Sequence, residues 1–93
     1  MPGQRATSIS TSTLVYTGAA YVHEIYVQAG DDNAEVGLAN AVATGGTRVI
    51  GLRALATSQG VRAFPSPGVY FGTGIYATTT GTDPIIEIVY SIT

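Results

Sequence analysis

Short runs of alternating apolar and polar residues, separated by glycine, aspartate and proline, constrain the fold of this chain more than any other feature. A period of two is typical of a β-strand with one buried face. Residues 20–29 and 85–92 alternate most clearly, and turn-forming residues occupy 30–33, 44–47, 57–60, 65–68 and 81–84. Such spacing is typical of a sandwich or jelly roll. The sequence therefore predicts an all-β fold, a small antiparallel jelly-roll-like sandwich of seven to eight strands.

The alternation also predicts the core. Within residues 20–29, the more apolar set includes Tyr21 and His23, and we expect this set to face inward. Residues 34–43 contain enough alanine for a helix, but Gly37 and Asn40 disfavour one, so a strand over 35–40 is preferred. The expected core consists of Ile25, Val27, Val36, Leu38, Ile86, Ile88 and Tyr90.

The first thirteen residues differ from the rest, because they are rich in serine and threonine and are apolar only at Met1 and Ile9. This composition predicts an extended N-terminal arm over 1–13 and a sandwich domain over 14–93. We expect the arm to dock on a neighbouring chain, where Arg5 would pair with an acid. On this interpretation, its removal weakens attachment without unfolding the domain.

The charge content is low for a chain of 93 residues, at 11% against about 25% in typical proteins. All four basic residues are arginine, which interfaces favour over lysine. We infer that much of the surface is covered by other subunits, although a compositional habit of the source genome would give the same pattern. A net charge of −2 also lacks the basic footprint of a nucleic-acid-binding protein.

The apolar runs are far shorter than the roughly 20 residues that cross a bilayer. The N-terminus lacks the apolar segment of a secretory signal. We therefore expect synthesis in the cytoplasm and no membrane partner. With no cysteine, the chain has no disulfide, no thiolate metal site and no cysteine nucleophile.

Residues that could carry chemistry are few. His23 is the only histidine, so an imidazole-rich metal site is excluded and a structural role is expected. The turn with Asp31, Asp32, Asn33 and Glu35 offers oxygen ligands, but it lacks the EF-hand spacing and is interpreted as a solvated hairpin tip. No G-x-S-x-G motif occurs. The sequence thus predicts no catalytic, cofactor-binding or metal-binding residue, and no enzyme.

Aromatic residues leave one alternative open. Six tyrosines (Tyr16, Tyr21, Tyr26, Tyr70, Tyr76 and Tyr90) join Phe64 and Phe71. Nucleic-acid stacking normally requires a cationic groove, which four scattered arginines do not form. Most of these rings are expected at the core boundary or in subunit interfaces. A carbohydrate-binding platform is the alternative.

The segment 66–76 (SPGVYFGTGIY), the Thr-Gly-Thr at 80–82 and the Ile-Val-Tyr at 88–90 resemble small virion proteins of tailed bacteriophages. The resemblance covers about residues 14–93 and is firmest at 36–38 and 71–75. It implies a head decoration or cement protein, commonly a homotrimer, that binds the major capsid protein. The expected location is the virion. The resemblance transfers no catalytic residue.

Two other classes of function remain. A receptor-binding or tail-fibre tip domain, or another phage tail component, would use the tyrosines for carbohydrate. The second alternative class is a small enzyme subunit or a soluble binding domain that is unrelated to phage. The short chain has no coiled-coil or repetitive stem, which favours decoration over a fibre, and the missing nucleophile–base pair argues against an enzyme.

Overall fold

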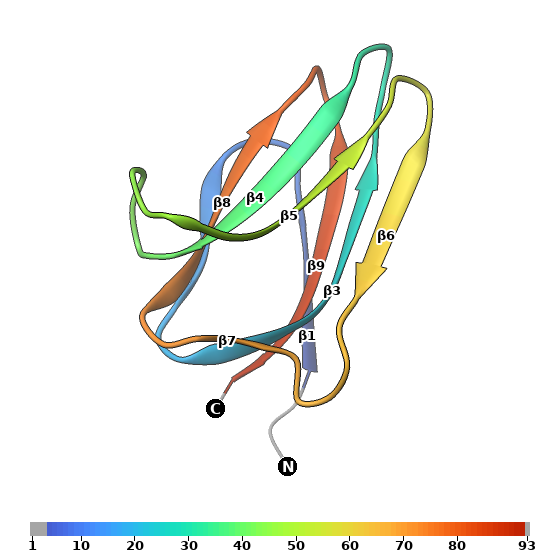
Figure 1. Cartoon of the computed structure of the whole chain (residues 1–93). Helices are drawn as coiled ribbons and strands as arrows, with labels where there is room; N and C mark the ends of the chain where they lie inside the picture. The colour runs from blue at the N-terminus through green and yellow to red at the C-terminus, as the bar shows by residue number, and fades with distance from the viewer. Residues whose placement is uncertain (1–3, 93) are drawn as a thin grey trace.

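A computed structural model describes residues 4–92 and folds them into two antiparallel sheets packed face to face (Figure 1). No helix occurs within this span, and residues 34–40 are a strand, as predicted. Nine strands replace the expected seven to eight: β1 (Gln4–Ile9), β2 (Thr13–Thr17), β3 (Ala20–Gln28), β4 (Ala34–Asn40), β5 (Arg48–Ala54), β6 (Gln59–Ala63), β7 (Val69–Phe71), β8 (Gly74–Thr80) and β9 (Ile85–Ile92).

The strands pair in a nested order. β4 pairs with β5, β3 with β6, β2 with β8 and β1 with β9, so the first four strands run antiparallel to later ones. The resulting sheets have the orders β1-β9-β3-β6 and β2-β8-β4-β5, and the short β7 also pairs with β3. This is the strand arrangement of a jelly roll. The predicted fold class is confirmed.

The N-terminal segment corrects one prediction. Gln4–Ile9, assigned to an arm outside the sandwich, is extended as expected but forms β1, whose six residues pair with β9 from Gln4–Ser91 to Ile9–Ile86. The boundary at residue 13 therefore does not separate arm from domain, while residues 1–3 lie outside the described span. An edge strand buries little of its surface, so threonine and serine suffice to form it.

The core lies between the sheets and contains all seven predicted residues, each at most 4% exposed. Phe71 and Ile75 are also fully buried. No polar or charged side chain within residues 4–92 is buried. Apolar burial from both sheets is thus the main source of stability.

A β-bulge in β3 overturns the predicted facing of its first half. The register with β9 passes from Val22–Tyr90 directly to Glu24–Val89, so His23 is an extra residue. The alternation changes phase there, and Ala20 and Val22 point inward instead of Tyr21 and His23.

Candidate interaction surface

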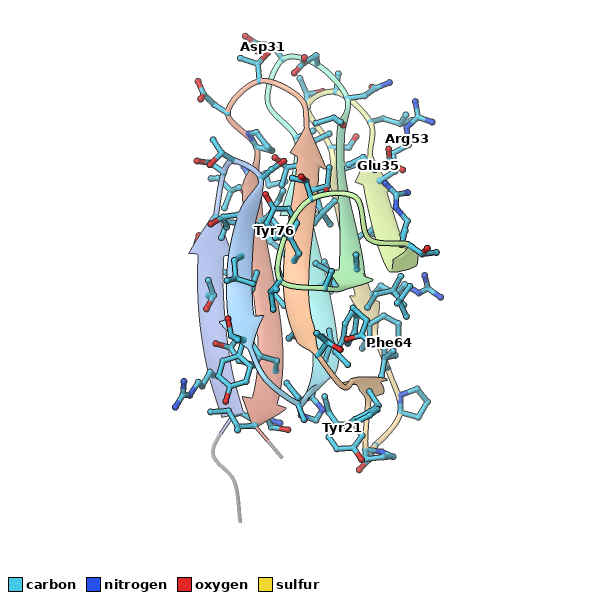
Figure 2. The ribbon with its side chains drawn as sticks, turned by 90° about the vertical axis from the view of Figure 1, so that its left-hand side faces the viewer. Tyr21, Asp31, Glu35, Arg53, Phe64 and Tyr76 are labelled. Atoms are coloured by element: carbon cyan, nitrogen blue, oxygen red, sulfur yellow. The ribbon has the colours of Figure 1, made fainter. Side chains whose placement is uncertain are left out.

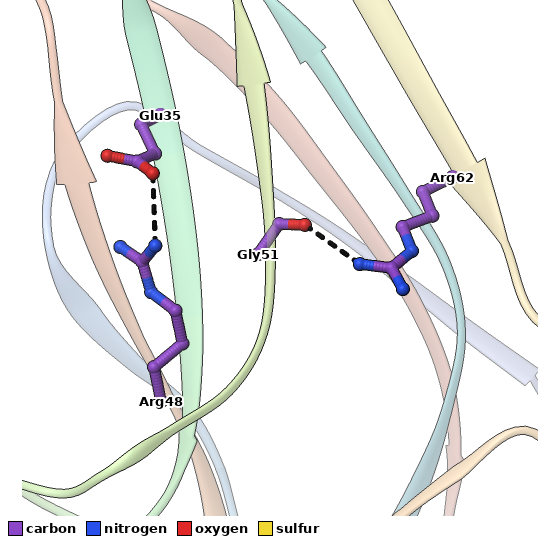
Figure 3. A network of polar contacts seen from close by, with 4 residues as sticks. All are labelled: Glu35, Arg48, Gly51 and Arg62. Atoms are coloured by element: carbon purple, nitrogen blue, oxygen red, sulfur yellow. Dashed lines mark hydrogen bonds and ion pairs between the residues drawn. The ribbon is translucent and has the colours of Figure 1, made fainter.

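Three of the four arginines have partners within the chain. On the outer face of the β2-β8-β4-β5 sheet, Arg48 Nη1 donates to Glu35 Oε2 at 3.0 Å (Figure 3). Gly37 and Gly51 pair across β4 and β5, and a Cβ on Gly37 would lie 2.3 Å from Arg48 Nε. The bare backbone of this glycine pair therefore leaves room for the guanidinium. The alternation of apolar and polar residues did not predict this arrangement, and its signal in the sequence is one glycine in the middle of each strand.

Arg62 and Arg5 occupy the two long openings between the sheets. Arg62 on β6 donates from Nη1 to the Gly51 carbonyl oxygen of the opposite sheet at 3.2 Å (Figure 3), and it lies over the Phe64 ring at 5.1 Å. Arg5 on β1 lies over the Tyr16 ring of the opposite sheet at 5.9 Å. Arg5 thus makes a cation–π contact within this chain, and its pairing with an acid on another chain stays a prediction.

The acidic turn joins loops at one end of the sandwich. Asp32 accepts hydrogen bonds from Thr82, at 2.9 Å from the backbone nitrogen and 3.2 Å from the hydroxyl. The Asn33 side-chain oxygen accepts from the Ala56 backbone nitrogen at 2.9 Å. Between residues 4 and 92, no group of three or more His, Asp or Glu side chains has the arrangement of a metal site. These polar side chains connect three turns to one another.

The bulged His23 lies beside the last strand. Its Nε2 atom is 2.8 Å from Ser91 Oγ, and its backbone oxygen accepts from the Phe64 nitrogen at 2.9 Å. Next to it, Tyr21 and Tyr70 pair across β3 and β7 with ring centroids 5.2 Å apart. Tyr70 is 55% exposed. Of the tyrosines that the sequence offers for a carbohydrate platform, Tyr21 and Tyr70 are therefore the two that pair at the described surface.

The other tyrosines are more dispersed. Tyr16 packs against Tyr90 at 5.7 Å, at the boundary of the core. The Tyr26 hydroxyl donates to Gln59 Oε1 at 2.7 Å on the outer face of the other sheet. Tyr76 lies on the outer face of β8, opposite Ala39 and Leu14 (Figure 2). A platform that unites all the tyrosines therefore does not form.

The outer faces of the two sheets differ, because a loop of the chain covers part of one of them. The loop between β4 and β5 folds back over the β2-β8-β4-β5 sheet (Figure 2), where a Cβ on Gly46 would lie 3.2 Å from the Ala39 Cβ. Ala39 is buried as a result, although it lies on the outer face. The outer face of the β1-β9-β3-β6 sheet carries exposed polar side chains such as Gln28 and Glu87.

Apolar side chains are exposed mainly at the margins of the sandwich. Among residues 4–92, seven large ones are between 39% and 63% exposed: Leu14, Val42, Val49, Leu55, Val61, Tyr70 and Ile85. All except Ile85 lie in a loop or on a strand that forms a sheet edge. No helix in the described part of the chain is long and apolar enough to cross a membrane.

Comparisons with known proteins place the fold but not the family. No protein-family model matches the chain, and no curated protein matches it either. It is similar to a solved structure from the disulfide-linked pili that form Bacillus endospore appendages, with a TM-score of 0.57 and 11% identity over 98% of this chain and 88% of that chain. This likeness shows a shared fold.

Two further structures are more distant. The virus-like particle of Macrobrachium rosenbergii extra small virus matches with a TM-score of 0.42 and 13% identity, over 98% of this chain and 79% of that chain. Hydroquinone 1,2-dioxygenase from Sphingomonas matches with a TM-score of 0.36 and 12% identity, over 97% and 58%. At these scores neither carries an argument about this chain.

Proposed function

We propose that the protein is a structural subunit of a multi-subunit particle, and specifically a decoration protein on the outer surface of a tailed-phage head. The observation that carries this proposal is the position of the exposed apolar side chains, which lie at sheet edges and loops. Apolar side chains at such margins are suited to contacts with neighbouring subunits. Only 11% of the residues are charged, so covering part of the surface with neighbouring subunits would favour solubility more for this chain than for most.

The choice of a phage head as the particle rests on the sequence resemblance to small phage virion proteins. The pilus structure with the same fold supports an assembly role, because it comes from an appendage built of many subunits. That assembly is linked by disulfides, whereas this chain has no cysteine, so its contacts would be non-covalent. The major capsid protein is the proposed partner, and no reaction is assigned.

The proposal is tested with heads of the encoding phage that were assembled without this protein. Purified protein is added, and the particles are examined by cryo-electron microscopy and by heating. We expect density on the outer shell and a higher temperature of shell disruption. Leu55→Ser with Val61→Ser should reduce occupancy, whereas Ala63→Ser on the same strand should not. Density on the tail, or none on the shell, contradicts the proposal.

A second function is favoured by the Tyr21–Tyr70 pair, in which Tyr70 is exposed and which has the His23 and Ser91 polar groups nearby. Aromatic faces with adjacent hydrogen-bonding groups bind sugars, as a tail-fibre tip would require. A glycan array with the wild type and Tyr70→Ala distinguishes this function. Binding that Tyr70→Ala abolishes favours the tip domain, and no binding by the wild type excludes it.

A further inference from the structure

The four sheet edges differ in regularity. β2 contains a bulge, because its register with β8 passes from Leu14–Tyr76 to Tyr16–Ile75 and leaves Val15 extra. β5 contains another, because Ile50 and Arg48 oppose consecutive residues of β4 and Val49 is extra. Bulges twist an edge and disrupt its pairing with a further strand.

The edge beside β3 is interrupted rather than bulged. It consists of β6 and the three-residue β7, which are joined by a segment that contains Pro65 and Pro67. Short edge strands and prolines both prevent the addition of another strand. Three of the four edges therefore carry a device that opposes strand pairing.

The fourth edge, β1, has none of these interruptions. β1 lies beside β9 at the margin of its sheet (Figure 1). All six residues pair with β9 in one unbroken register, and the strand contains no proline, glycine or bulge. Its single charged side chain, Arg5, reaches across the opening to Tyr16 on the opposite sheet. In the described part of the chain, no hydrogen bond joins the β1 backbone to any segment other than β9. Alternate backbone groups of β1 are thus directed outward.

We propose that β1 pairs antiparallel with β1 of a second copy of this chain, about a two-fold axis at Thr7, so that the β1-β9-β3-β6 sheets of two copies join. A two-fold contact requires a self-complementary edge, and β1 is the edge whose regularity permits pairing along its length. A closed trimer would need β1 to pair with a different edge, and each of the others is interrupted.

The side-chain pattern selects the axis. Residues that are directly opposite in an antiparallel pair share a face, so the two paired numbers must have an even sum. An axis at Thr7 sets Ala6 opposite Ser8 and Thr7 opposite Thr7, which is a favourable cross-strand pair. It also sets Arg5 opposite the half-buried Ile9, whose apolar surface the arginine stem can cover. An axis at Arg5 would instead place like charges opposite each other.

The contact is small and mostly polar, so it should be weak in solution. The few hydrogen bonds of one short strand must offset the translational and rotational freedom that is lost on association. We expect a dissociation constant on the order of 1 µM to 1 mM. This property belongs to the isolated chain and does not rest on the proposed function, so either can fail alone.

Sedimentation equilibrium from about 10 µM to about 1 mM tests the pairing, given that range of affinities. The wild type should approach twice the monomer mass of 9.5 kDa. Ala6→Lys with Ser8→Lys places like charges opposite each other twice and should weaken association at least tenfold. Ala6→Glu with Ser8→Lys places opposite charges at the same positions and should restore it. Ala63→Lys on β6 is the matched control and should leave association unchanged.

Circular dichroism of each variant separates loss of pairing from loss of fold. In its own sheet, position 8 faces Glu87, so a lysine there is compatible with the monomer. A wild type that remains monomeric throughout, or that forms a trimer, overturns the proposal. Association that responds equally to the like-charge and opposite-charge variants, or only to Ala63→Lys, overturns it as well.

Discussion

The two long sides of the sandwich are built differently. On one side β5 and β6 from opposite sheets lie against each other, and Arg62 joins them through the Gly51 carbonyl oxygen. On the other side, β1 and β2 are connected across the opening by the weaker contact of Arg5 with Tyr16. The first side combines irregular edges with a bridge between the sheets, whereas the second leaves the regular strand β1 at its margin. The comparison shows that one fold can protect its edges unequally.

The largest effect is expected from removing β1 itself. Deletion of residues 1–9 uncovers the flank of β9, which carries the core residues Ile86, Ile88 and Tyr90. We expect a loss of roughly 3–5 kcal/mol, similar to a large truncation in a core. The thermal midpoint should therefore fall by more than about 10 °C. A midpoint within about 2 °C of the wild type would mean that this segment is an independent arm after all.

On the opposite side, Arg62→Met keeps the apolar stem but removes the bridge between the sheets. The variant loses the hydrogen bond to Gly51 and the cation–π contact with Phe64. Because the side chain is exposed, the expected cost is only about 1 kcal/mol in urea unfolding. An unchanged midpoint in urea would show that Arg62 does not join the sheets in solution.

Arg5→Met makes the matched test on the β1 side. This variant loses one exposed contact, the one between the Arg5 guanidinium and the Tyr16 ring. We expect a cost of about 0.5 kcal/mol, smaller than that of Arg62→Met. If Arg5→Met is the more destabilising of the two, the comparison between the two sides is wrong.

The smallest effect is expected away from both sides, at the Arg48–Glu35 pair. Its side chains are 50% and 37% exposed, so solvent screens their attraction. Glu35→Gln should cost between 0 and about 0.5 kcal/mol in low salt. The difference should disappear in about 1 M salt, where the Debye length is about 3 Å. A larger cost that persists in high salt would show that the pair holds the sheet together.

The sequence predicted those parts of the fold that one strand determines by itself. Alternation in residues 85–92 identified Ile86, Ile88 and Tyr90 as core, and all three are buried. The predicted facing of the side chains was wrong in the first half of residues 20–29, because the bulge at His23 is defined by the register against β9. A pattern within one segment cannot show where its partner skips a residue.

The interaction surface was less predictable for a similar reason. Gln4–Ile9 contains a single large apolar residue and so resembled an arm, because an edge strand needs little apolar surface. The sequence did not predict the intrachain contacts of Arg5, Arg48 and Arg62, because their partners come from strands distant in the sequence. Only the fold brings these groups together.

Backbone hydrogen exchange tests the central claim about the β1 edge most directly. In a dilute sample, alternate amides of Gln4–Ile9 should exchange rapidly because they point away from β9. As the protein concentration rises, these amides should become protected, while the exposed amides on β5 and β6 continue to exchange at the same rate. Rapid exchange of the outward β1 amides at every concentration, or equal protection of all the edges, would contradict the account.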